Sequence, residues 1–149
     1  MLLETLTKLY LRDLHKLKKE ISLYKNEKKI WHTDKEILNS AGNLCLHLVG
    51  NLNTYIGKEL GHSGYVRNRD LEFSQKDVSR EELIQKVDDT ISVVEKTMSE
   101  LNEEQLNQEY PALVFHEKTS TEYMLVHLAT HLGYHLGQVN YHRRLLDSE

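Results

Sequence analysis

Apolar residues recur every three or four positions along four long stretches of the chain, with polar residues between them. This spacing gathers the apolar side chains on one face of a helix, so each stretch is predicted to be an amphipathic helix. No segment shows the sustained alternation that is typical of strands. The core positions expected in the first helix are Leu3, Leu6, Tyr10, Leu14, Leu17, Ile21 and Tyr24.

The second helix is predicted to run from the N-cap Ser40 to about Leu60, where Gly61 provides a stop. Trp31, in the polar link before it, is expected to plug the edge of the core. The inward positions of this helix are Leu44, Leu48, Leu52, Tyr55 and Ile56, and His47 and Asn51 lie on the same strip.

The third and fourth helices each open with a predicted capping box, Ser79 with Glu82 and Thr119 with Glu122. The fourth helix is expected to end near Leu146. The buried face of the third helix is predicted to hold Leu83, Val87, Ile91, Val94, Met98 and Leu101.

Two long connections separate these helices. Residues 62–78 read as an ordered loop without helical period, and residues 107–118 form an irregular segment that contains the only proline. The expected fold is therefore all-α, a four-helix bundle with long crossover connections. A chain of 149 residues can bury a proper core and is predicted to form one domain over residues 1–149.

Composition narrows the setting in which the protein works. The net charge is −4 and charges of both signs are mixed throughout, which argues against nucleic-acid or membrane-surface partners. The apolar runs are too short to cross a membrane, and the first residues lack signal-peptide features. Cys45 is the single cysteine, so no intramolecular disulfide can form. We expect a soluble, cytoplasmic protein.

Four histidines mark the fourth predicted helix: His127, His131, His135 and His142. At about 100° per residue they fall within an arc of about 80°. Imidazole is the commonest metal ligand in proteins, and histidines one turn apart can hold one ion. Most histidines, however, are surface residues or hydrogen-bonded core residues. That interpretation is favoured for those without a ligand-spaced neighbour, His15, His32, His62 and His116.

His142 lies near the end of the helix, where the helix dipole alone explains a positive residue. His131 and His135 differ, because two imidazoles beside an apolar face are costly to bury without partners. A metal ion satisfies both. His47 is the only histidine on the inward-facing strip of another predicted helix. Three histidines leave coordination positions open for water or substrate, as in catalytic sites. His127 would lie one turn away, in an adjacent role.

The histidine pattern resembles the DinB-like superfamily, which includes thiol-dependent S-transferases and proteins assigned as metal-dependent hydrolases. The resemblance rests on the histidine in SAGNLCLHLVGNL and on HLGYHLGQ, with GHSGYVRNRDLEF and NYHRRLL similar to one subgroup. It implies a four-helix bundle of unusual topology and frequent homodimerisation. It also implies a divalent metal held by His47, His131 and His135, with His127 outside the motif.

Other residues near the histidines also have physical interpretations. Gly137 would permit close approach of a neighbouring helix. Gln138 and Asn51 would hydrogen-bond a ligand ring or bound water, or else link two helices. Four charged loop residues would either clamp an anionic substrate or pin the loop in a salt-bridge network. They are Arg67, Arg69, Asp70 and Glu72.

A neutral three-histidine shell leaves the charge of the ion uncompensated, so bound water or thiol loses its proton easily. The leading hypothesis is a metal-dependent enzyme (Zn, Ni or Fe) that activates a small-molecule substrate, a low-molecular-weight thiol, for S-transfer. The alternatives are a metal-dependent hydrolase and a non-catalytic metal-binding or dimerisation module. No glutamate falls on the histidine face, which disfavours hydrolysis. The catalytic candidates are His127, Gln138 and Asn51, and the expected assembly is a homodimer.

Overall fold

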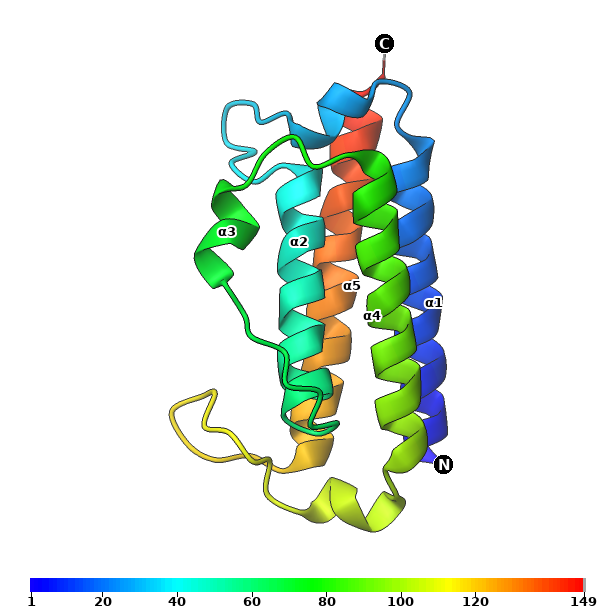
Figure 1. The fold of residues 1–149 in the computed structure, drawn as a ribbon, viewed down its shortest axis with the longest axis vertical. Coiled ribbons are helices and arrows are strands. Elements are labelled where there is room, and N and C mark those ends of the chain that lie inside the picture. The colour runs from blue at the N-terminus through cyan, green and yellow to red at the C-terminus, as the bar shows by residue number, and fades with distance from the viewer. Residues whose placement is uncertain (149) are drawn as a thin grey trace.

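The computed structural model describes residues 1–148, which form helices joined by loops (Figure 1). Among these residues there are two isolated bridges but no β-strand, so the fold is all-α as predicted. Three short helical turns are η1 (Glu27–Trp31), η2 (Asn53–Lys58) and η3 (Glu103–Asn107). The α-helices are α1 (Leu2–Leu23), α2 (Ala41–Leu52), α3 (Arg69–Ser74), α4 (Arg80–Glu100) and α5 (Thr121–Leu146).

The four long helices pack in a ring in which α1 and α2 are each flanked by α4 and α5. Helices α1 and α5 run in one direction along the bundle, and α2 and α4 run in the other (Figure 1). Because neighbours α2 and α4 are parallel, the chain must return along the bundle between them. Residues 59–79 make this crossing on the outside of α2, and α3 lies within it.

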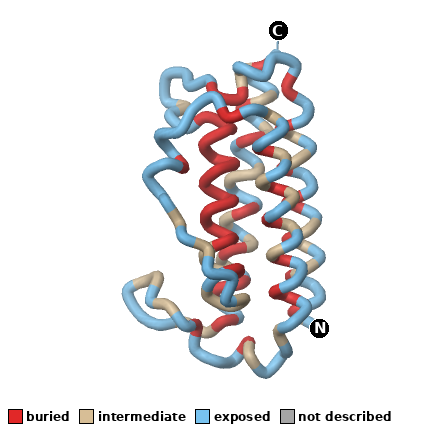
Figure 2. The backbone as a smooth tube through the Cα atoms, viewed as in Figure 1, coloured by how far each residue is buried: buried red, intermediate tan, exposed pale blue. Residues whose placement is uncertain are grey.

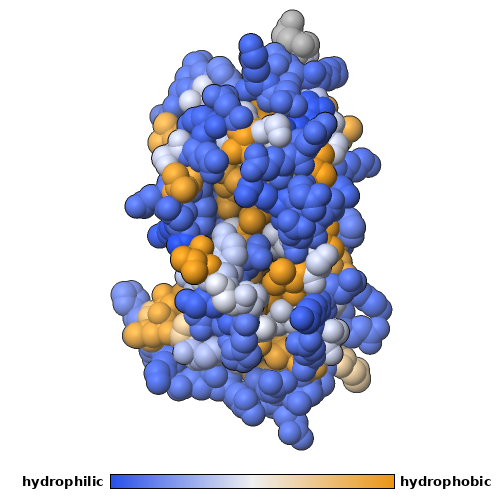
Figure 3. All heavy atoms as spheres, viewed as in Figure 1, coloured by the Kyte–Doolittle hydropathy of each residue, from blue (hydrophilic) through white to orange (hydrophobic). Residues whose placement is uncertain are grey.

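The core follows the predicted apolar pattern, since all seven positions expected in the first helix are buried. Every residue of α2 is buried, because the crossing segment covers the side that faces away from the bundle (Figure 2). The surface in Figure 3 is mainly hydrophilic, with hydrophobic residues in separated groups. None of the helices described is long and apolar enough to cross a membrane.

Local structure departs from the sequence-based prediction at three places. The segment 62–78 contains a short helix, α3, whose N-cap Asn68 accepts a hydrogen bond from Leu71 N. The second helix changes to π-helical form at Asn53 and does not continue as an α-helix. The N-cap of α5 is Ser120 and not Thr119, whose carbonyl is bound by Tyr110 N across the preceding loop.

Candidate metal centre

The three histidines predicted as ligands meet between two antiparallel helices. His47 lies in the middle of α2, and His131 and His135 lie one turn apart on α5. One ring nitrogen from each can be chosen so that all three lie within 4.8 Å of one another. The Nε2 atoms of His47 and His131 are 3.2 Å apart. Positions that are 84 residues apart in the sequence therefore form one cluster that could hold a metal ion.

The cluster fits a divalent ion by the chemistry of its donors. Two nitrogens that each bind one ion at about 2.0–2.1 Å lie about 2.8–3.4 Å apart, from adjacent octahedral to tetrahedral positions. The Nε2–Nε2 distance of 3.2 Å between His47 and His131 lies in this range. The Nδ1 atom of His131 is buried without a hydrogen-bond partner in residues 1–148. An ion bound at Nε2 leaves the proton on this Nδ1 atom, so the Nε2–Nε2 distance and not Nδ1 supports an ion here.

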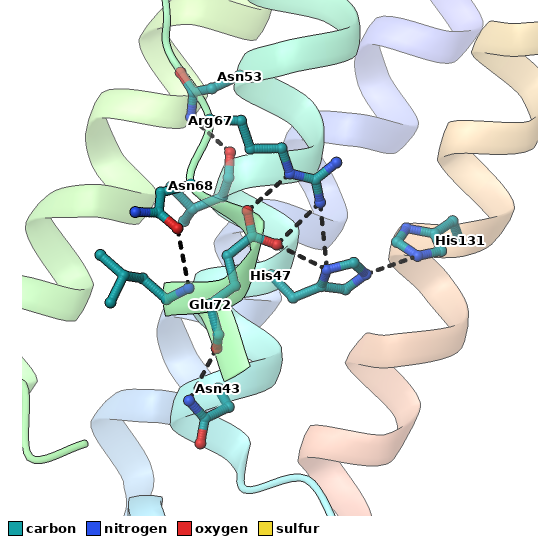
Figure 4. Close-up of polar contacts among 9 residues, drawn as sticks. Asn43, His47, Asn53, Arg67, Asn68, Glu72 and His131 are labelled. Carbon is teal, nitrogen blue, oxygen red and sulfur yellow. Dashed lines mark hydrogen bonds and ion pairs between the residues drawn. The ribbon is translucent and has the colours of Figure 1, made fainter. Parts of the chain in front are cut away.

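Glu72 of α3 contacts the Nδ1 side of the His47 ring, opposite the Nε2 atom that faces His131 (Figure 4). His47 Nδ1 donates to Glu72 Oε1 at 3.0 Å, which leaves the Nε2 lone pair facing His131. Arg67 donates to both carboxylate oxygens of Glu72, at 2.8 and 2.9 Å. Arg67 Nη2 also lies 3.4 Å from His47 Nδ1, but two donors do not bond, so the carboxylate sets the tautomer.

The Arg67–Glu72 pair is itself shielded from water. The side chain of Glu72 is 7% exposed and that of Arg67 is 14% exposed. Although burial favours the neutral acid, the hydrogen bonds from His47 and Arg67 keep the pKa of Glu72 below its ordinary value. The carboxylate is therefore ionised at neutral pH and polarises the His47 ring.

Gly50 gives Glu72 the space to reach His47. A Cβ atom built at Gly50 would lie 1.9 Å from Glu72 Oε2 and 2.6 Å from its carboxyl carbon. Glycine in the middle of a helix costs about 1 kcal/mol relative to alanine, so it needs a local reason. Here the reason is the close approach of the carboxylate to the α2 backbone.

His135 and His131 are suited to metal binding in a different way. The Nδ1–H of His135 donates to Gln138 Oε1 at 2.7 Å, which was one of the two interpretations of Gln138, and leaves Nε2 free. Burial, together with the neighbouring rings of His135 and His47, lowers the pKa of His131 to about 4. Burial also lowers the pKa of His135. Both rings are therefore neutral at pH 7, which is the form that binds metals.

A pocket of about 290 Å³ lies beside the cluster. His127 lies in its wall, where it stacks on His131 and packs edge-to-face against Phe115, but it is not part of the three-histidine group. The whole lining consists of His47, Asn51, Tyr55, Arg67, Arg69, Val114, Met124, His127, Leu128 and His131.

The remaining sequence-based assignments have mixed outcomes. Arg67 and Glu72 form an internal salt bridge, which was one of the two interpretations, whereas Arg69 and Asp70 are exposed. The close approach expected at Gly137 is wrong, because a Cβ atom there meets nothing within 4 Å. Asn51 makes no side-chain hydrogen bond to any of residues 1–148, and its Oδ1 atom is buried.

His142 is a buried structural residue, and the helix dipole does not explain its position. Its Nδ1 accepts from the Tyr24 hydroxyl at 2.6 Å, and its Nε2–H donates to the His32 carbonyl at 2.7 Å. The four histidines expected to lie outside any site are exposed: His15, His32, His62 and His116.

Sequence reasoning did not place Glu72 and Gly50 at the site. The only local signal was the glycine in mid-helix, three residues after His47. The Glu72 contact depends on how the crossing segment folds over α2. The periodicity of apolar residues does not predict this path.

Comparison with known proteins supports this fold. Residues 3–149 match the family described as "Protein of unknown function (DUF1572)". A crystal structure described as that of the conserved protein of locus from Enterococcus faecalis is similar, with a TM-score of 0.80 and 15% identity. The similarity covers 98% of this chain and 97% of that chain, and at this identity it shows the fold alone. No curated protein sequence matches the chain significantly.

Proposed function

We propose that this chain, which belongs to the DUF1572 family, is a metal-dependent enzyme that activates a low-molecular-weight thiol for transfer to an electrophile. The observation that carries the proposal is the convergence of His47, His131 and His135 beside a pocket. The resemblance to DinB-like S-transferases adds the reaction class. Zinc, nickel and iron all suit a shell of three imidazoles.

A divalent ion in this cluster would lower the pKa of a bound thiol and so supply thiolate at neutral pH. The protein's own contribution is to hold two of the three rings in the required tautomers. Glu72 does this for His47 and Gln138 does it for His135. Because Gln138 already bonds to His135, we assign it to positioning.

His127 is the best-placed residue to accept the proton of the incoming thiol. Its ring lies in the pocket wall next to His131, with a distance of 6.3 Å between the ring centroids. It makes no side-chain hydrogen bond within residues 1–148, so both ring nitrogens remain available to a ligand. Asn51 is the remaining candidate for contact with the substrate.

Hydrolysis is the second candidate function, because water can occupy the position of the thiol. Hydrolytic zinc sites commonly recruit a carboxylate as base. No aspartate or glutamate lines this pocket, and Glu72 is already bound by Arg67 and His47. This lack of a free carboxylate favours the thiol. A non-catalytic metal-binding module is the third alternative.

The first test is metal content after purification without added metal, measured by elemental analysis. We expect about one divalent ion per chain in the wild type and in His127→Ala. Loss of the ion is expected in His47→Ala, His131→Ala and His135→Ala, with the helical circular dichroism spectrum retained. Stoichiometric metal in His131→Ala would contradict the site.

The second test is activity. Metal-loaded protein is screened with small thiols and a chromogenic electrophile, and His127→Ala is the matched variant that keeps the ion. Thiol consumption that depends on His131 and slows in His127→Ala supports S-transfer. Ester or amide hydrolysis without thiol would instead support the hydrolase.

A further inference from the structure

The pocket beside the histidine cluster carries an unbalanced positive charge. It is lined by two arginines, Arg67 and Arg69, and by no acidic residue. Arg67 is neutralised by Glu72, which lies behind the wall, and its guanidinium lies 5.7 Å from the ring centroid of Tyr55. Arg69 is exposed and has no acidic partner within 4 Å among the residues that the structure describes, so no carboxylate of these residues competes with an anionic ligand for its guanidinium.

A second group in the same wall lacks a partner. Asn51 is 7% exposed and lies one helical turn after His47 on α2. Its Oδ1 atom is buried without a hydrogen bond, although buried side-chain polar atoms are usually paired. Nearly buried amides of this kind are costly unless a ligand or water satisfies them. The side-chain oxygen of Asn51 is therefore available to accept a hydrogen bond from a ligand in the pocket.

The rest of the lining limits what the ligand can be. Val114, Met124 and Leu128 provide an apolar wall beside the charged and polar residues. A volume of about 290 Å³ is at the lower end of the range for small-molecule sites, which is about 300–1,000 Å³. The ligand must be small and must combine a short apolar segment with a negatively charged group.

We propose that this pocket binds a small ligand bearing a carboxylate, which Arg69 holds by charge-assisted hydrogen bonds while Asn51 Oδ1 accepts a hydrogen bond from a donor group elsewhere on the ligand. This inference rests on the proposed function only in taking the other end of the ligand to be the thiol that faces His47 and His131. Arg69 and Asn51 thus determine which thiol is accepted, and the histidine cluster determines the chemistry.

The test compares two thiols of nearly equal size, 3-mercaptopropionate and its neutral amide. Cobalt-loaded protein is titrated with each, and the thiolate-to-cobalt absorption band reports binding. We expect the carboxylate to bind at least about tenfold more tightly than the amide, as one charge-assisted hydrogen bond would give. Arg69→Gln should remove this preference.

Arg144→Gln is the matched control, because Arg144 is an exposed arginine of α5 that lies over the Tyr141 ring and does not line the pocket. It should bind both thiols like the wild type. Equal affinity of the two thiols for the wild type, or an unchanged preference in Arg69→Gln, would overturn the carboxylate assignment even though metal and thiol bind.

A further experiment separates this inference from the proposed function. Metal-free protein is titrated with propionate and propionamide, and amide chemical shifts are followed by nuclear magnetic resonance. Propionate should shift pocket signals in the wild type but not in Arg69→Gln. If cobalt or thiol fails to bind while propionate still binds, the proposed function fails and the anion site stands. If neither probe shifts the pocket signals, the anion site is refuted.

Discussion

The Glu72 carboxylate accepts a hydrogen bond from His47 Nδ1 at 3.0 Å, although the two residues are 25 positions apart and on different helices. The parallel arrangement of α2 and α4 requires a crossing segment, and this contact joins that segment to α2 at His47. A segment that only covered the core would contact α2 through apolar side chains. The crossing segment instead places the Arg67–Glu72 ion pair against the His47 ring. Carboxylates that hydrogen-bond a ligand histidine fix the ring and raise its basicity. The crossing segment is therefore part of the candidate site.

Replacing Glu72 tests this relationship directly. Glu72→Gln keeps the size of the side chain but removes the charge that orients His47 and neutralises Arg67. We expect metal affinity to fall by about 10–100-fold, the usual effect of losing such a partner. Competition with a chromophoric chelator measures this. Asp70→Asn is the control because Asp70 is exposed on the same helix, and an equal loss there would refute the specific role of Glu72.

Gly50 and Gly137 form a matched pair of helical glycines with opposite expectations. Gly50→Ala should displace Glu72 and weaken metal binding as Glu72→Gln does, because the added Cβ would overlap the carboxylate. Gly137→Ala has open space and should raise the free energy of unfolding by about 1 kcal/mol. Urea unfolding of metal-free protein and the chelator assay measure the two effects. An unchanged metal affinity in Gly50→Ala would show that Glu72 can move without consequence.

Much of the fold could be predicted because it depends on local periodicity. The apolar residues of α1 and the caps Ser40 and Ser79 were identified from neighbours within one or two turns. The shift of the α5 cap from Thr119 to Ser120 shows the limit. Either hydroxyl can cap a helix, and a long-range hydrogen bond to the Thr119 carbonyl decides between them.

The candidate site divides in the same way. His131 and His135 could be paired from their spacing, and His47 could be added because few buried positions carry histidine. Glu72 could not be placed, since its position depends on the path of residues 59–79 across α2. The role predicted for Gly137 was wrong because sequence shows that a glycine tolerates close approach without showing that anything approaches.

Homodimerisation stays a prediction, and α5 is where we expect it. Tyr134, Tyr141 and Leu145 are between 60% and 66% exposed on this helix. Gly137 lines an open groove between α1 and α5. Sedimentation equilibrium at micromolar concentration should give twice the mass of the 17.5 kDa chain. Tyr141→Glu should shift the equilibrium toward the monomer, whereas Ser92→Glu on the exposed face of α4 should not. A wild-type monomer would refute the prediction.

The stability of the metal-free protein should depend on pH through His142. Burial lowers the pKa of His142, and the hydrogen bond to the His32 carbonyl offsets this only in part. Above about pH 6.5 the ring is neutral in both the folded and unfolded chains, so no stability is lost. As the pH falls below that value, the unfolded chain binds a proton that the folded chain resists, and the free energy of unfolding decreases.

Urea unfolding between pH 7.5 and pH 5 measures this dependence. Protonated His142 could not accept a hydrogen bond from the Tyr24 hydroxyl. The contact between the C-terminal ends of α1 and α5 would then be lost. His142→Gln should be less stable than the wild type at pH 7.5 and should lose less stability on acidification. His131, whose pKa is lowered to about 4, contributes in the same direction, so His131→Ala should also flatten the profile. His15→Ala is the control, because His15 is exposed and should leave the pH profile unchanged. A pH profile of His142→Gln that is as steep as that of the wild type would show that the buried ring is not responsible.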